Sequence, residues 1–444
     1  MKDLDLTKVN NVHFIGIGGI GISAIARMML KEGKHVTGQD LNHSEIVKEL
    51  VKEGVDVKIG QLYENIPANT ELVVYTIAIE NYDPDLFEKL KSQTNIPIRS
   101  YPEMLGIVSE DKYTIAISGT HGKTTTTGMI AQILRDAGKD PTVIIGSLLV
   151  GDKSNFIAGK SEYFVAEACE YKRSFLNINP KILVITNIDA DHLDYYKDIE
   201  DIKSAFRALA MKVPSDGYVV CNPEDENIGD VVKGINAKVM NYTDFLNPVT
   251  KLKIPGIHNK SNAAAAFAVA SILATSYTNT NNALGGFPGT WRRFEYKGEL
   301  SNGTLVYDDY AHHPAEIKAT LQGFRELYKK EEGWALTVIF QPHLFSRTKL
   351  LLPDFATSFK DADMVLVLPI YYAREEDDGT ISSKILADRV SESGTKAESF
   401  SDFKTAEDYI KVWLPKMNEK DIIITMGAGE AFKIGDILLG AHSV

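Results

Sequence analysis

Short apolar stretches and longer helical stretches alternate along the whole chain. The first apolar strand is predicted over residues 12–17, and a glycine turn leads from it into an Ala-, Met- and Leu-rich helix over residues 20–31. This alternation is typical of α/β domains with mostly parallel sheets. Further strands are predicted to end at Asp40 and to cover residues 71–76, 96–98, 114–118, 163–167, 182–187, 218–222, 304–308, 335–340, 364–368 and 421–426, and further helices to cover residues 124–137, 261–274 and 314–329.

The strand–turn–helix pattern starts anew twice, which indicates three α/β domains. The second round begins after a polar, acidic stretch over residues 109–113, and the third begins near Glu295. At ~150 residues per domain, a chain of 444 residues has room for two or three domains. We therefore predict domains over residues 1–108, 109–295 and 296–444.

Charge and composition indicate which kinds of molecule the protein can bind. The chain holds 48 Lys and Arg residues against 60 Asp and Glu residues, a formal net charge of −12. A surface of this sign repels nucleic acid and acidic membranes, so an anionic small molecule needs a local basic pocket. The longest uncharged run contains one continuous apolar block, residues 263–274, which is too short to span a bilayer, and the N-terminus carries acids where a signal peptide is apolar. We expect a cytoplasmic monomer or homodimer that binds neither nucleic acid nor membranes.

The segment SGTHGKTT, residues 118–125, lies between an apolar strand and a helix. Backbone N–H groups and the helix N-terminus at such a turn favour an anion, and the lysine adds a point charge. A hydroxyl directly after the lysine is the usual ligand to the magnesium that accompanies ATP. A glycine turn with an unrelated lysine is the alternative. The segment predicts ATP phosphate binding by Gly119, Thr120, Gly122, Lys123, Thr124 and Thr125.

A second glycine-rich turn, GIGGIG over residues 16–21, occupies the same strand-to-helix position, and Asp40 ends the next strand. Glycines there permit a tight turn and close approach of a diphosphate to the backbone. A nicotinamide cofactor, another nucleotide diphosphate and a mere packing turn all fit this motif. Two separate phosphate-binding turns favour a protein that handles two phosphorylated molecules.

Two further polar residues follow apolar strands. Glu167 ends one strand, and His192 follows another in the segment NIDADH, residues 187–192. Because the carboxyl ends of parallel strands converge where the phosphate turn opens, we expect both side chains to reach one metal region. A carboxylate suits magnesium well, whereas an imidazole suits it less and could act through water or on a second ion. The alternative for His192 is a loop histidine that caps a helix.

Four polar clusters stand at later strand ends or helix starts, where α/β folds bind ligands. They cover residues 255–262, 291–294, 308–314 and 341–347. Any one of them could be a surface loop. Their joint occurrence favours a ligand site.

Ten collinear motifs resemble those of the Mur ligase family over essentially the whole chain. In order they read FIGIGGIGISAIA, GTHGKTTTT, EACEY, TNIDADHLDY, PGIHNKSNAAAA, WRRFE, YDDYAHHPAEI, FQPHLFSRT, PIYYAREE and TMGAGE. The resemblance implies an N-terminal Rossmann-like domain for a UDP-sugar, a central P-loop ATPase-like domain with a parallel sheet, and a C-terminal Rossmann-like domain for the incoming amino acid. It implies ATP and Mg²⁺ as cofactors, and UDP-N-acetylmuramate and L-alanine as partners.

The resemblance also implies roles for single residues. The UDP-sugar contacts are Gly16, Gly18, Gly19, Gly21, Ser23, Asp40 and His121. Lys123 holds the γ-phosphate, and the magnesium ligands are Thr124, Glu167 and His192. Further ATP contacts are His258 and Asn259 at the nucleoside, Arg293 at a phosphate and Asp308 or Asp309 at the ribose. The amino-acid pocket, where a guanidinium can pair with a carboxylate, is lined by Tyr310, His312, His343 and Arg347. The catalytic set is Lys123, Glu167, His192, His343 and Arg347.

A few positions depart from the family pattern. Cys169 stands where many relatives have aspartate, and Leu344 stands where a polar residue is common. The segment between Tyr242 and Pro255 is short, so we expect one or more strands of a small central-domain sheet to be missing. Relatives elsewhere in the family use a carbamoylated lysine to bridge magnesium, but we expect Lys203 to be a plain surface lysine.

The activity implied is ATP-dependent amide formation in the synthesis of peptidoglycan precursors. The lactyl carboxylate of the sugar attacks the γ-phosphorus of ATP, and the amine of L-alanine then displaces phosphate from the acyl phosphate. One alternative is a relative that joins the same UDP-sugar to a preformed tripeptide, although Phe294 and Tyr310 look more like those of the alanine-adding enzyme. A second is a nicotinamide oxidoreductase, which leaves the lysine-bearing turn unexplained. A third is a nucleotide-switch binding module without ligase activity, which leaves the polar clusters at residues 308–314 and 341–347 unexplained.

Overall fold

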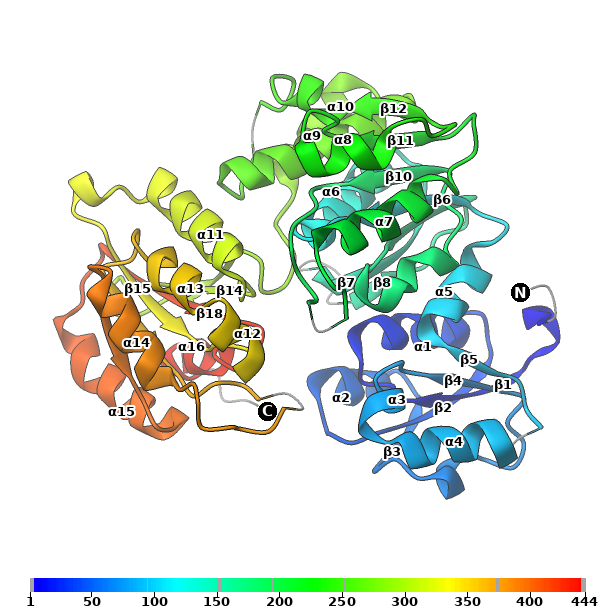
Figure 1. Ribbon diagram of the computed structural model, residues 1–444, viewed down its shortest axis with the longest axis horizontal. Coiled ribbons are helices and arrows are strands. Elements are labelled where there is room, and N and C mark those ends of the chain that lie inside the picture. Colours follow the sequence, from blue (N-terminus) through cyan, green and yellow to red (C-terminus); the bar gives the residue numbers. More distant parts are fainter. Residues whose placement is uncertain are drawn as a thin grey trace. The chain divides into compact units, whose positions relative to one another are not determined.

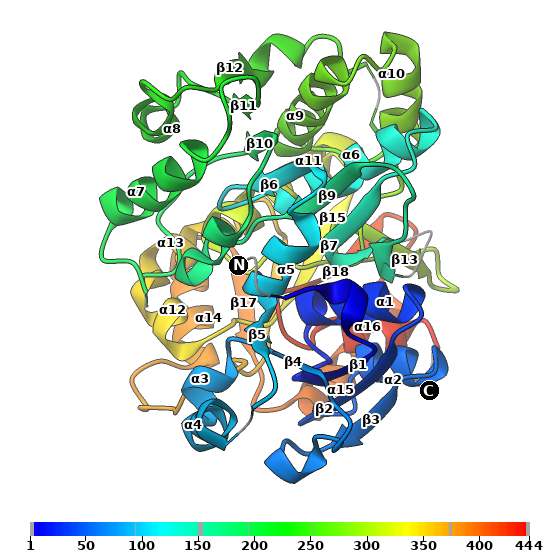
Figure 2. The same cartoon turned by 90° about the vertical axis from the view of Figure 1, so that its right-hand side faces the viewer.

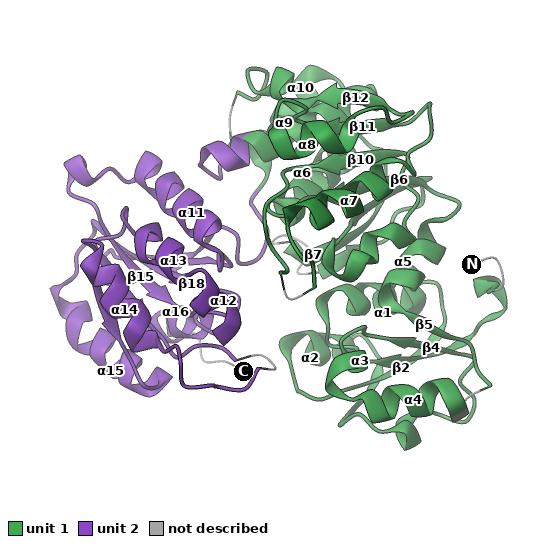
Figure 3. Cartoon of the chain, in the orientation of Figure 1, with its two compact units in different colours: residues 1–252, 261–287 green, residues 253–260, 288–444 purple. Residues whose placement is uncertain are grey.

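The computed structural model describes residues 4–93, 95–149, 154–193, 195–250, 252–372 and 375–440. Ala373 and Arg374 of the motif PIYYAREE lie outside these ranges. The chain divides into two compact units, unit 1 with residues 1–252 and 261–287 and unit 2 with residues 253–260 and 288–444 (Figure 3). In the described residues, unit 1 contains two sheets and unit 2 contains one, so the α/β fold with three sheets is confirmed (Figure 1). None of the helices that the structure describes is long and apolar enough to cross a bilayer.

The first sheet of unit 1 has five parallel strands in the order β3-β2-β1-β4-β5. Its strands are β1 (Asn11–Ile15), β2 (His35–Asp40), β3 (Asp56–Ile59), β4 (Leu72–Tyr75) and β5 (Ile98–Ser100), and its helices are α1 (Ile20–Lys31), α2 (Glu45–Lys52), α3 (Ile79–Tyr82), α4 (Pro84–Gln93) and α5 (Tyr101–Ser109). All four residues of β4 are buried, as expected for a parallel strand with helices on both faces. The chain moves outward from β1 first in one direction and then in the other. The glycine turn after β1 therefore lies at the switch point where such sheets bind ligands.

The second sheet of unit 1 has the order β12-β11-β10-β6-β9-β7-β8, and every pair is parallel except β7 with β8. Its strands are β6 (Tyr113–Ser118), β7 (Thr142–Leu149), β8 (Ser154–Ile157), β9 (Tyr163–Glu167), β10 (Ile182–Ile185), β11 (Tyr218–Cys221) and β12 (Lys238–Asn241), and its helices are α6 (Lys123–Asp136), α7 (Ile199–Ala210), α8 (Glu226–Val232), α9 (Ile257–Ile272) and α10 (Tyr277–Gly286). The predicted phosphate turn follows β6, which lies between β10 and β9. This turn also lies at a point where the order of the strands reverses.

Two details of the second sheet bear on the sequence predictions. The described residues between Tyr242 and Pro255 form a short 3₁₀ helix, Tyr242–Phe245, and no strand. The helix predicted over residues 261–274 begins earlier, at Ile257. His258 and Asn259 therefore lie in the first turn of α9, rather than in a loop before it.

The two sheets of unit 1 are joined through α1 and α5, which lie between them in both views (Figures 1 and 2). Helix α1 packs against β7 and β8 of the second sheet, and α5 leads the chain from one sheet into the other. A capping box fixes the start of α5, because Ser100 accepts a hydrogen bond from the Glu103 N–H while the Glu103 carboxylate accepts from the Ser100 N–H. Buried apolar side chains of both sheets form one continuous core.

Unit 2 contains one sheet in the order β13-β14-β18-β15-β16-β17, parallel except for the first pair. Its strands are β13 (Glu295–Glu299), β14 (Leu305–Asp309), β15 (Ala335–Phe340), β16 (Met364–Val367), β17 (Lys396–Ser399) and β18 (Asp421–Met426), and its helices are α11 (Pro314–Leu327), α12 (Phe345–Leu350), α13 (Leu352–Ser358), α14 (Ser383–Glu392), α15 (Phe403–Trp413) and α16 (Phe432–Leu438). The loops after β14 and β15 carry two of the polar clusters predicted to bind a ligand.

A buried ion pair ties the carboxyl ends of these strands together. The side chains of Arg292 and Asp308 are 3% and 0% exposed, and their Nε and Oδ2 atoms are 2.7 Å apart. The same guanidinium donates to the carbonyl oxygens of Gly427 at 2.6 Å and Gly429 at 2.9 Å, while Thr425 donates to the other carboxylate oxygen at 2.6 Å. The pair thus holds the segment before β13 against β14 and the loop after β18.

We predict that Arg292→Met lowers the free energy of unfolding by ~3–5 kcal/mol, because it leaves the Asp308 carboxylate buried without a counter-ion. Chemical denaturation followed by tryptophan fluorescence measures this in unit 2, since all three tryptophans, Trp291, Trp334 and Trp413, lie there. The matched control is Arg389→Met, because its ion pair with Glu392 is exposed and is worth only ~0–1 kcal/mol. Equal losses in the two variants would contradict a central role for the buried pair.

Candidate active site

The turn between β6 and α6 depends on two glycines. Gly119 and Gly122 have φ values of +130° and +83°. A Cβ on Gly119 would lie 2.0 Å from Thr186 Oγ1, and one on Gly122 would lie 2.4 Å from Asn262 Oδ1. The local sequence therefore forms a tight loop whose backbone lies directly against neighbouring side chains.

This loop is fixed from the end of the neighbouring strand β10. The Thr186 hydroxyl and the Asn187 amide donate to the carbonyl oxygen of His121 at 2.6 and 3.0 Å, and the Asn187 side chain accepts from the His121 N–H at 2.8 Å. The Thr120 hydroxyl accepts from the Asp189 N–H at 2.8 Å. The loop conformation is therefore set by the protein itself before any ligand arrives.

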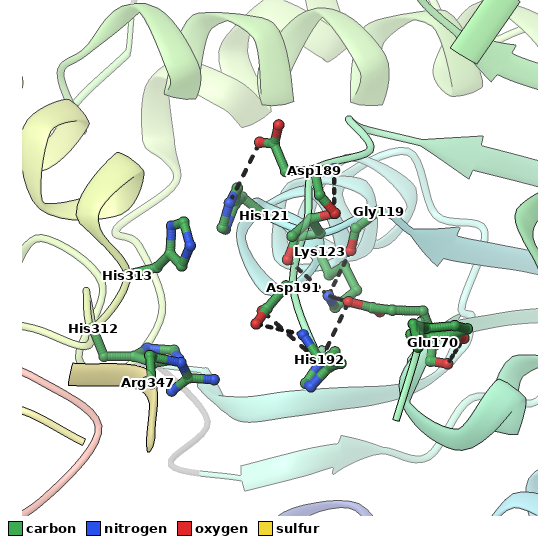
Figure 4. A network of polar contacts seen from close by, with 12 residues as sticks. Gly119, His121, Lys123, Glu170, Asp189, Asp191, His192, His312, His313 and Arg347 are labelled. Atoms are coloured by element: carbon green, nitrogen blue, oxygen red, sulfur yellow. Dashed lines mark hydrogen bonds and ion pairs between the residues drawn. The ribbon is translucent and has the colours of Figure 1, made fainter. Parts of the chain in front are cut away.

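Lys123, the first residue of α6, folds back over this loop (Figure 4). Its ammonium donates to the carbonyl oxygens of Gly119 at 2.5 Å and Thr120 at 3.0 Å, and it lies 3.0 Å from a carboxylate oxygen of Glu170. Burial by itself lowers the pKa of Lys123, but the carboxylates of Glu170 and Glu167 raise it overall. The lysine is therefore a fixed positive charge at the mouth of the loop.

The partner of this lysine, Glu170, was missed as a functional residue from the sequence. Its side chain is 3% exposed and also lies 3.7 Å from His192 Nε2. The motif EACEY offers two glutamates, and the structure places Glu167 at the end of β9 and Glu170 in the turn that follows, beside the lysine. Such a turn leaves no clear periodic signal in the sequence.

The predicted metal ligands lie around the same loop. Thr124 follows Lys123 in the first turn of α6, and Glu167 ends β9 with one carboxylate oxygen 2.7 Å from the Gly146 N–H. In the described part of the chain, no group of three or more His, Cys, Asp and Glu side chains forms a ready-made metal site. Mg²⁺ usually takes one or two carboxylates, several waters and the phosphates of its substrate. These residues therefore fit an ion that arrives with ATP, and their metal roles, with that of His192, stay predictions.

Both His121 and Lys203 lie near carboxylate groups. His121, predicted to contact the UDP-sugar, has its Nε2 atom 3.6 Å from a carboxylate oxygen of Asp189 (Figure 4). Lys203 forms ion pairs at 3.0 and 2.9 Å with Glu200 and Asp230, whose side chains are exposed. The Lys203 side chain itself is 11% exposed, and its expected role as a plain lysine stays a prediction.

The glycine turn after β1 is held by Asp40 at the end of β2. One carboxylate oxygen accepts from the Gly18 N–H at 2.8 Å, and a Cβ on Gly18 would lie 2.9 Å from that oxygen. Gly16 has a φ of +74°, and a Cβ there would lie 2.4 Å from Thr76 Cγ2. Asp40 thus stabilises the turn itself, whereas a nicotinamide enzyme uses the acid in this place to bind the ribose.

Ser23, which the resemblance places near a phosphate, has a completely buried side chain, and its phosphate contact stays a prediction. Its hydroxyl donates to the Ile20 carbonyl oxygen at 2.9 Å and accepts from the Asn155 amide at 2.8 Å. The hydroxyl is therefore committed to contacts between α1 and β8.

Tyr101 is a second residue that the sequence did not single out. Its ring lies against the glycine turn, because a Cβ on Gly21 would be 2.5 Å from Tyr101 Cζ. Burial and the nearby charge of Glu167 raise the pKa of Tyr101 well above its usual value. Tyr101 thus packs against the turn after β1. From the sequence alone, an aromatic residue at the start of a helix cannot be distinguished from an ordinary core residue.

In unit 2, the four residues predicted to line one pocket form one cluster. The rings of Tyr310 and His312 are 5.4 Å apart, and those of His312 and His343 are 6.0 Å apart. Arg347 Nη1 lies 3.4 Å from His343 Nδ1. The His343 ring also stacks on Tyr371 at 5.5 Å. The loops after β14 and β15 therefore meet at the carboxyl edge of the third sheet, as predicted.

The two histidines of this cluster are uncharged at neutral pH. Burial lowers the pKa of His312 to about 4, although the adjacent Glu316 opposes the shift. Burial lowers the pKa of His343 to about 3, with the charges of His312 and Arg347 acting in the same direction. Arg347 is then a cation beside neutral rings, an arrangement that suits a ligand carboxylate.

The residues predicted to contact the nucleoside and a phosphate of ATP also lie in unit 2. Asn259 donates to the Pro255 carbonyl oxygen at 2.7 Å, and burial lowers the pKa of His258 to about 4. The guanidinium of Arg293 lies over the Tyr310 ring at 5.0 Å, and its Nη1 is 3.7 Å from a carboxylate oxygen of Glu316. These side chains remain candidates for the ATP contacts predicted for them.

The predicted ribose contacts, Asp308 and Asp309, are both buried in unit 2. Asp308 is completely buried in its ion pair with Arg292. Asp309 is 5% exposed, and its carboxylate accepts from the N–H groups of Phe294 at 2.7 Å and Ala311 at 2.8 Å. Burial raises the pKa of Asp309 to about 6. Both carboxylates are engaged within unit 2, and a ribose contact by either one stays a prediction.

The geometry defines an α/β protein with two glycine turns at strand-order reversals in one unit and an arginine–histidine cluster in the other. Three family descriptions match the chain: Mur ligase family, catalytic domain over residues 11–113; Mur ligase middle domain over residues 117–245; and Mur ligase, glutamate ligase domain over residues 292–429. The chain belongs to the Mur ligase family. The family predicted from ten sequence motifs is thereby confirmed.

Individual relatives are similar to this chain along nearly its full length. The UDP-N-acetylmuramate–L-alanine ligase of Clostridium kluyveri is 40% identical and that of Acetivibrio thermocellus 42% identical, with 98% of this chain covered in both comparisons and 99% and 97% of those proteins. The crystal structure of UDP-N-acetylmuramate-alanine ligase MurC from Thermotoga maritima superimposes with a TM-score of 0.79 at 28% identity, over 97% of this chain and 98% of that one. A murein peptide ligase from Psychrobacter arcticus covers the same shares at a TM-score of 0.69 and 25% identity.

We predict that Glu170→Gln strengthens the binding of ATP measured without divalent metal. In the unchanged protein the γ-phosphate must displace the Glu170 carboxylate from Lys123 and approach a like charge, whereas the amide removes both obstacles. Isothermal titration calorimetry with a nonhydrolysable ATP analogue in EDTA measures the change. Glu200→Gln, which removes an exposed carboxylate, should leave the affinity unaltered. Weaker binding in the Glu170 variant would contradict the ion-pair exchange.

We predict that the protein loses stability as the pH falls from about 6.5 toward 4. His312 and His343 have pKa values in the folded protein below the ordinary 6.5, so the unfolded chain binds more protons in this range and acid favours unfolding. His343→Phe preserves the ring on Tyr371 and should flatten the slope of unfolding free energy against pH by up to ~1.4 kcal/mol per pH unit. Urea denaturation at a series of pH values tests this, with the exposed His35→Gln as the variant whose slope should match the unchanged protein.

Proposed function

We propose that this protein is the ATP-dependent ligase that joins the lactyl carboxylate of UDP-N-acetylmuramate to the amine of L-alanine in the synthesis of peptidoglycan precursors. The observation that carries the proposal is Lys123, held at the mouth of a glycine-built loop beside Glu170 and His192. A loop of this kind supports phosphoryl transfer. The names of full-length relatives at about 40% identity support the choice of acid and amine.

In this proposal the ATP phosphates bind at the turn after β6. The contacts are made by Gly119, Thr120, Gly122, Lys123, Thr124 and Thr125. The backbone N–H groups at the start of α6 and the lysine neutralise the charge on the phosphoryl oxygens. Lys123 exchanges the Glu170 carboxylate for the γ-phosphate as the nucleotide arrives.

Mg²⁺ is part of the proposal as the ion that accompanies the nucleotide. The ligands proposed for it are Thr124, Glu167 and His192. When bound, the ion offsets negative charge on the transferring phosphoryl group. Cys169 stands where many relatives have aspartate, so this position provides no additional carboxylate near the ion.

The UDP-sugar is proposed to bind at the turn after β1. Its diphosphate contacts the backbone at Gly16, Gly18, Gly19 and Gly21, where the start of α1 favours an anion. Asp40 acts indirectly, since its carboxylate holds the turn through the Gly18 N–H. His121, on the loop after β6, is the proposed contact to the sugar.

The amine donor is proposed to bind in unit 2. Arg347 pairs with the carboxylate of L-alanine, beside the neutral rings of Tyr310, His312 and His343. A neutral surrounding also favours the uncharged amine, which is the form that attacks. The domain boundaries proposed for these three tasks remain residues 1–108, 109–295 and 296–444.

The reaction requires two steps because a free carboxylate resists attack by an amine. First, a carboxylate oxygen of the lactyl group attacks the γ-phosphorus, the bond to ADP breaks, and an acyl phosphate forms. Second, the amine nitrogen attacks the acyl carbon, inorganic phosphate leaves, and the nitrogen loses a proton.

The proposed activity is tested by phosphate release with ATP, UDP-N-acetylmuramate and each candidate amine in turn. Release that depends on both the UDP-sugar and L-alanine is expected. Preference for a preformed tripeptide over L-alanine would identify the recycling activity instead. Tight NADH binding without any ATP dependence would overturn the ligase proposal.

We predict that Lys123→Ala lowers kcat about 10²- to 10³-fold, because the transition state loses its fixed positive charge. The affinity for UDP-N-acetylmuramate should stay within about threefold, since that ligand is proposed to bind the other turn. Lys203→Ala is the matched control and should retain full turnover. Turnover near that of the unchanged protein in the Lys123 variant would refute the phosphate role.

A further inference from the structure

Asn155 of β8 is a polar residue with no exposed surface, yet it takes part in neither phosphate turn. Its amide donates to the Ile20 carbonyl oxygen and, at 2.8 Å, to the Ser23 hydroxyl, while its side-chain oxygen accepts from Arg27 Nη1 at 2.5 Å. Both amide hydrogens and the oxygen of one side chain are thus used on a single helix. A buried amide costs stability unless it is fully paired, so this degree of pairing calls for an explanation.

All three partners lie on one face of α1. Residues 20, 23 and 27 follow the spacing of three and four that aligns side chains along a helix. Arg27 is itself buried and pairs with Glu53 at 2.8 Å, which fixes the guanidinium from its other side. Helix α1 begins directly after the glycine turn, and Ile20 is its first residue. Asn155 therefore forms hydrogen bonds with the end of the helix where the UDP diphosphate is proposed to bind.

The strand that carries Asn155 leads to the other site. β8 pairs with β7, and β7 pairs with β9, which ends at Glu167. Within β7 the regular pairing with β8 is interrupted after Ile144, and the Gly146 N–H donates to the Glu167 carboxylate at 2.7 Å. A Cβ on Gly146 would lie 2.6 Å from the other oxygen of that carboxylate, so the strand approaches it as closely as backbone can. The hairpin of β7 and β8 thus contacts α1 on one side and Glu167 on the other.

Tyr101 packs against the same end of α1. Its ring lies against Gly21, because a Cβ on that glycine would be 2.5 Å from Tyr101 Cζ. The start of α1 is therefore held by Tyr101 as well as by Asn155.

We propose that Asn155 is a positioning residue that fixes the start of α1, and with it the bound UDP-sugar, at the distance from Glu167 that phosphoryl transfer requires. The inference rests on the proposed function, because it assumes a UDP-sugar at the turn after β1 and ATP at the turn after β6. Asn155 touches neither substrate and acts through α1 and the hairpin. Because reacting atoms must lie within a few tenths of an ångström of the productive geometry, loss of this contact acts on turnover more than on binding.

The experiment compares steady-state kinetics of the unchanged protein, Asn155→Ala and a matched control. Asn155→Ala is expected to lower kcat about 10- to 100-fold, with KM for ATP and for UDP-N-acetylmuramate each changed by less than about threefold. The control is Asn302→Ala, which also removes an amide that bridges elements, at the carbonyl oxygens of Leu414 and Met417 in unit 2. A loss of folding stability alone would affect both variants, whereas the split between kcat and KM should appear only at Asn155.

A second variant keeps the test decisive if Asn155→Ala does not fold. Ser23→Ala removes one of the three contacts and leaves those to Ile20 and Arg27, so kcat should fall about two- to tenfold with both KM values unchanged. An unaltered kcat in a folded Asn155 or Ser23 variant, beside an active unchanged protein, would overturn the positioning role. Absence of L-alanine-dependent phosphate release in the unchanged protein would instead overturn the proposed function.

Discussion

The pairing of the Lys123 ammonium with the Glu170 carboxylate, both withdrawn from solvent, is the interaction on which the rest of the site depends. Burial favours the neutral form of the lysine, and the Glu170 carboxylate opposes this effect while no nucleotide is bound. A bound triphosphate can take the place of the carboxylate beside the ammonium. The glycines of the loop, the hydrogen bonds from the end of β10 and the turn after β9 all serve to bring these two groups together. The Lys123 ammonium thus stays protonated in the absence of the nucleotide and can pair with a phosphate when ATP binds.

The topology gives unit 1 two glycine turns, which are the binding sites proposed for the two nucleotide ligands. Each of its sheets places a glycine turn at the point where the order of its strands reverses, after β1 and after β6. Helix α1 starts at the first turn and packs against β7 and β8 of the second sheet, so a single element belongs to both sites. Unit 2 repeats the architecture, but its loops carry histidines and arginines suited to a small zwitterion instead of a glycine turn.

Much of this fold follows from the sequence, because parallel strands covered on both faces are continuous apolar runs. The strands β1, β6, β9, β10, β15 and β18 lie within a residue or two of their predicted positions. The β7–β8 hairpin was not predicted, since its polar Asn155 and its Gly146 interrupt any periodic pattern. At the site, the glycine turns could be located from residue type alone. The burial of Ser23, Asp308 and Asp309 could not be predicted, because residue type alone does not distinguish a buried hydroxyl or carboxylate from one that binds a ligand.

The most direct test of this account is a crystal structure with a nonhydrolysable ATP analogue, Mg²⁺ and UDP-N-acetylmuramate bound together. The account predicts that Lys123 Nζ leaves Glu170 and contacts the γ-phosphate, while the UDP diphosphate lies on the backbone at Gly18 and Gly19. A lysine that still pairs with Glu170, with the nucleotide bound elsewhere, would contradict it.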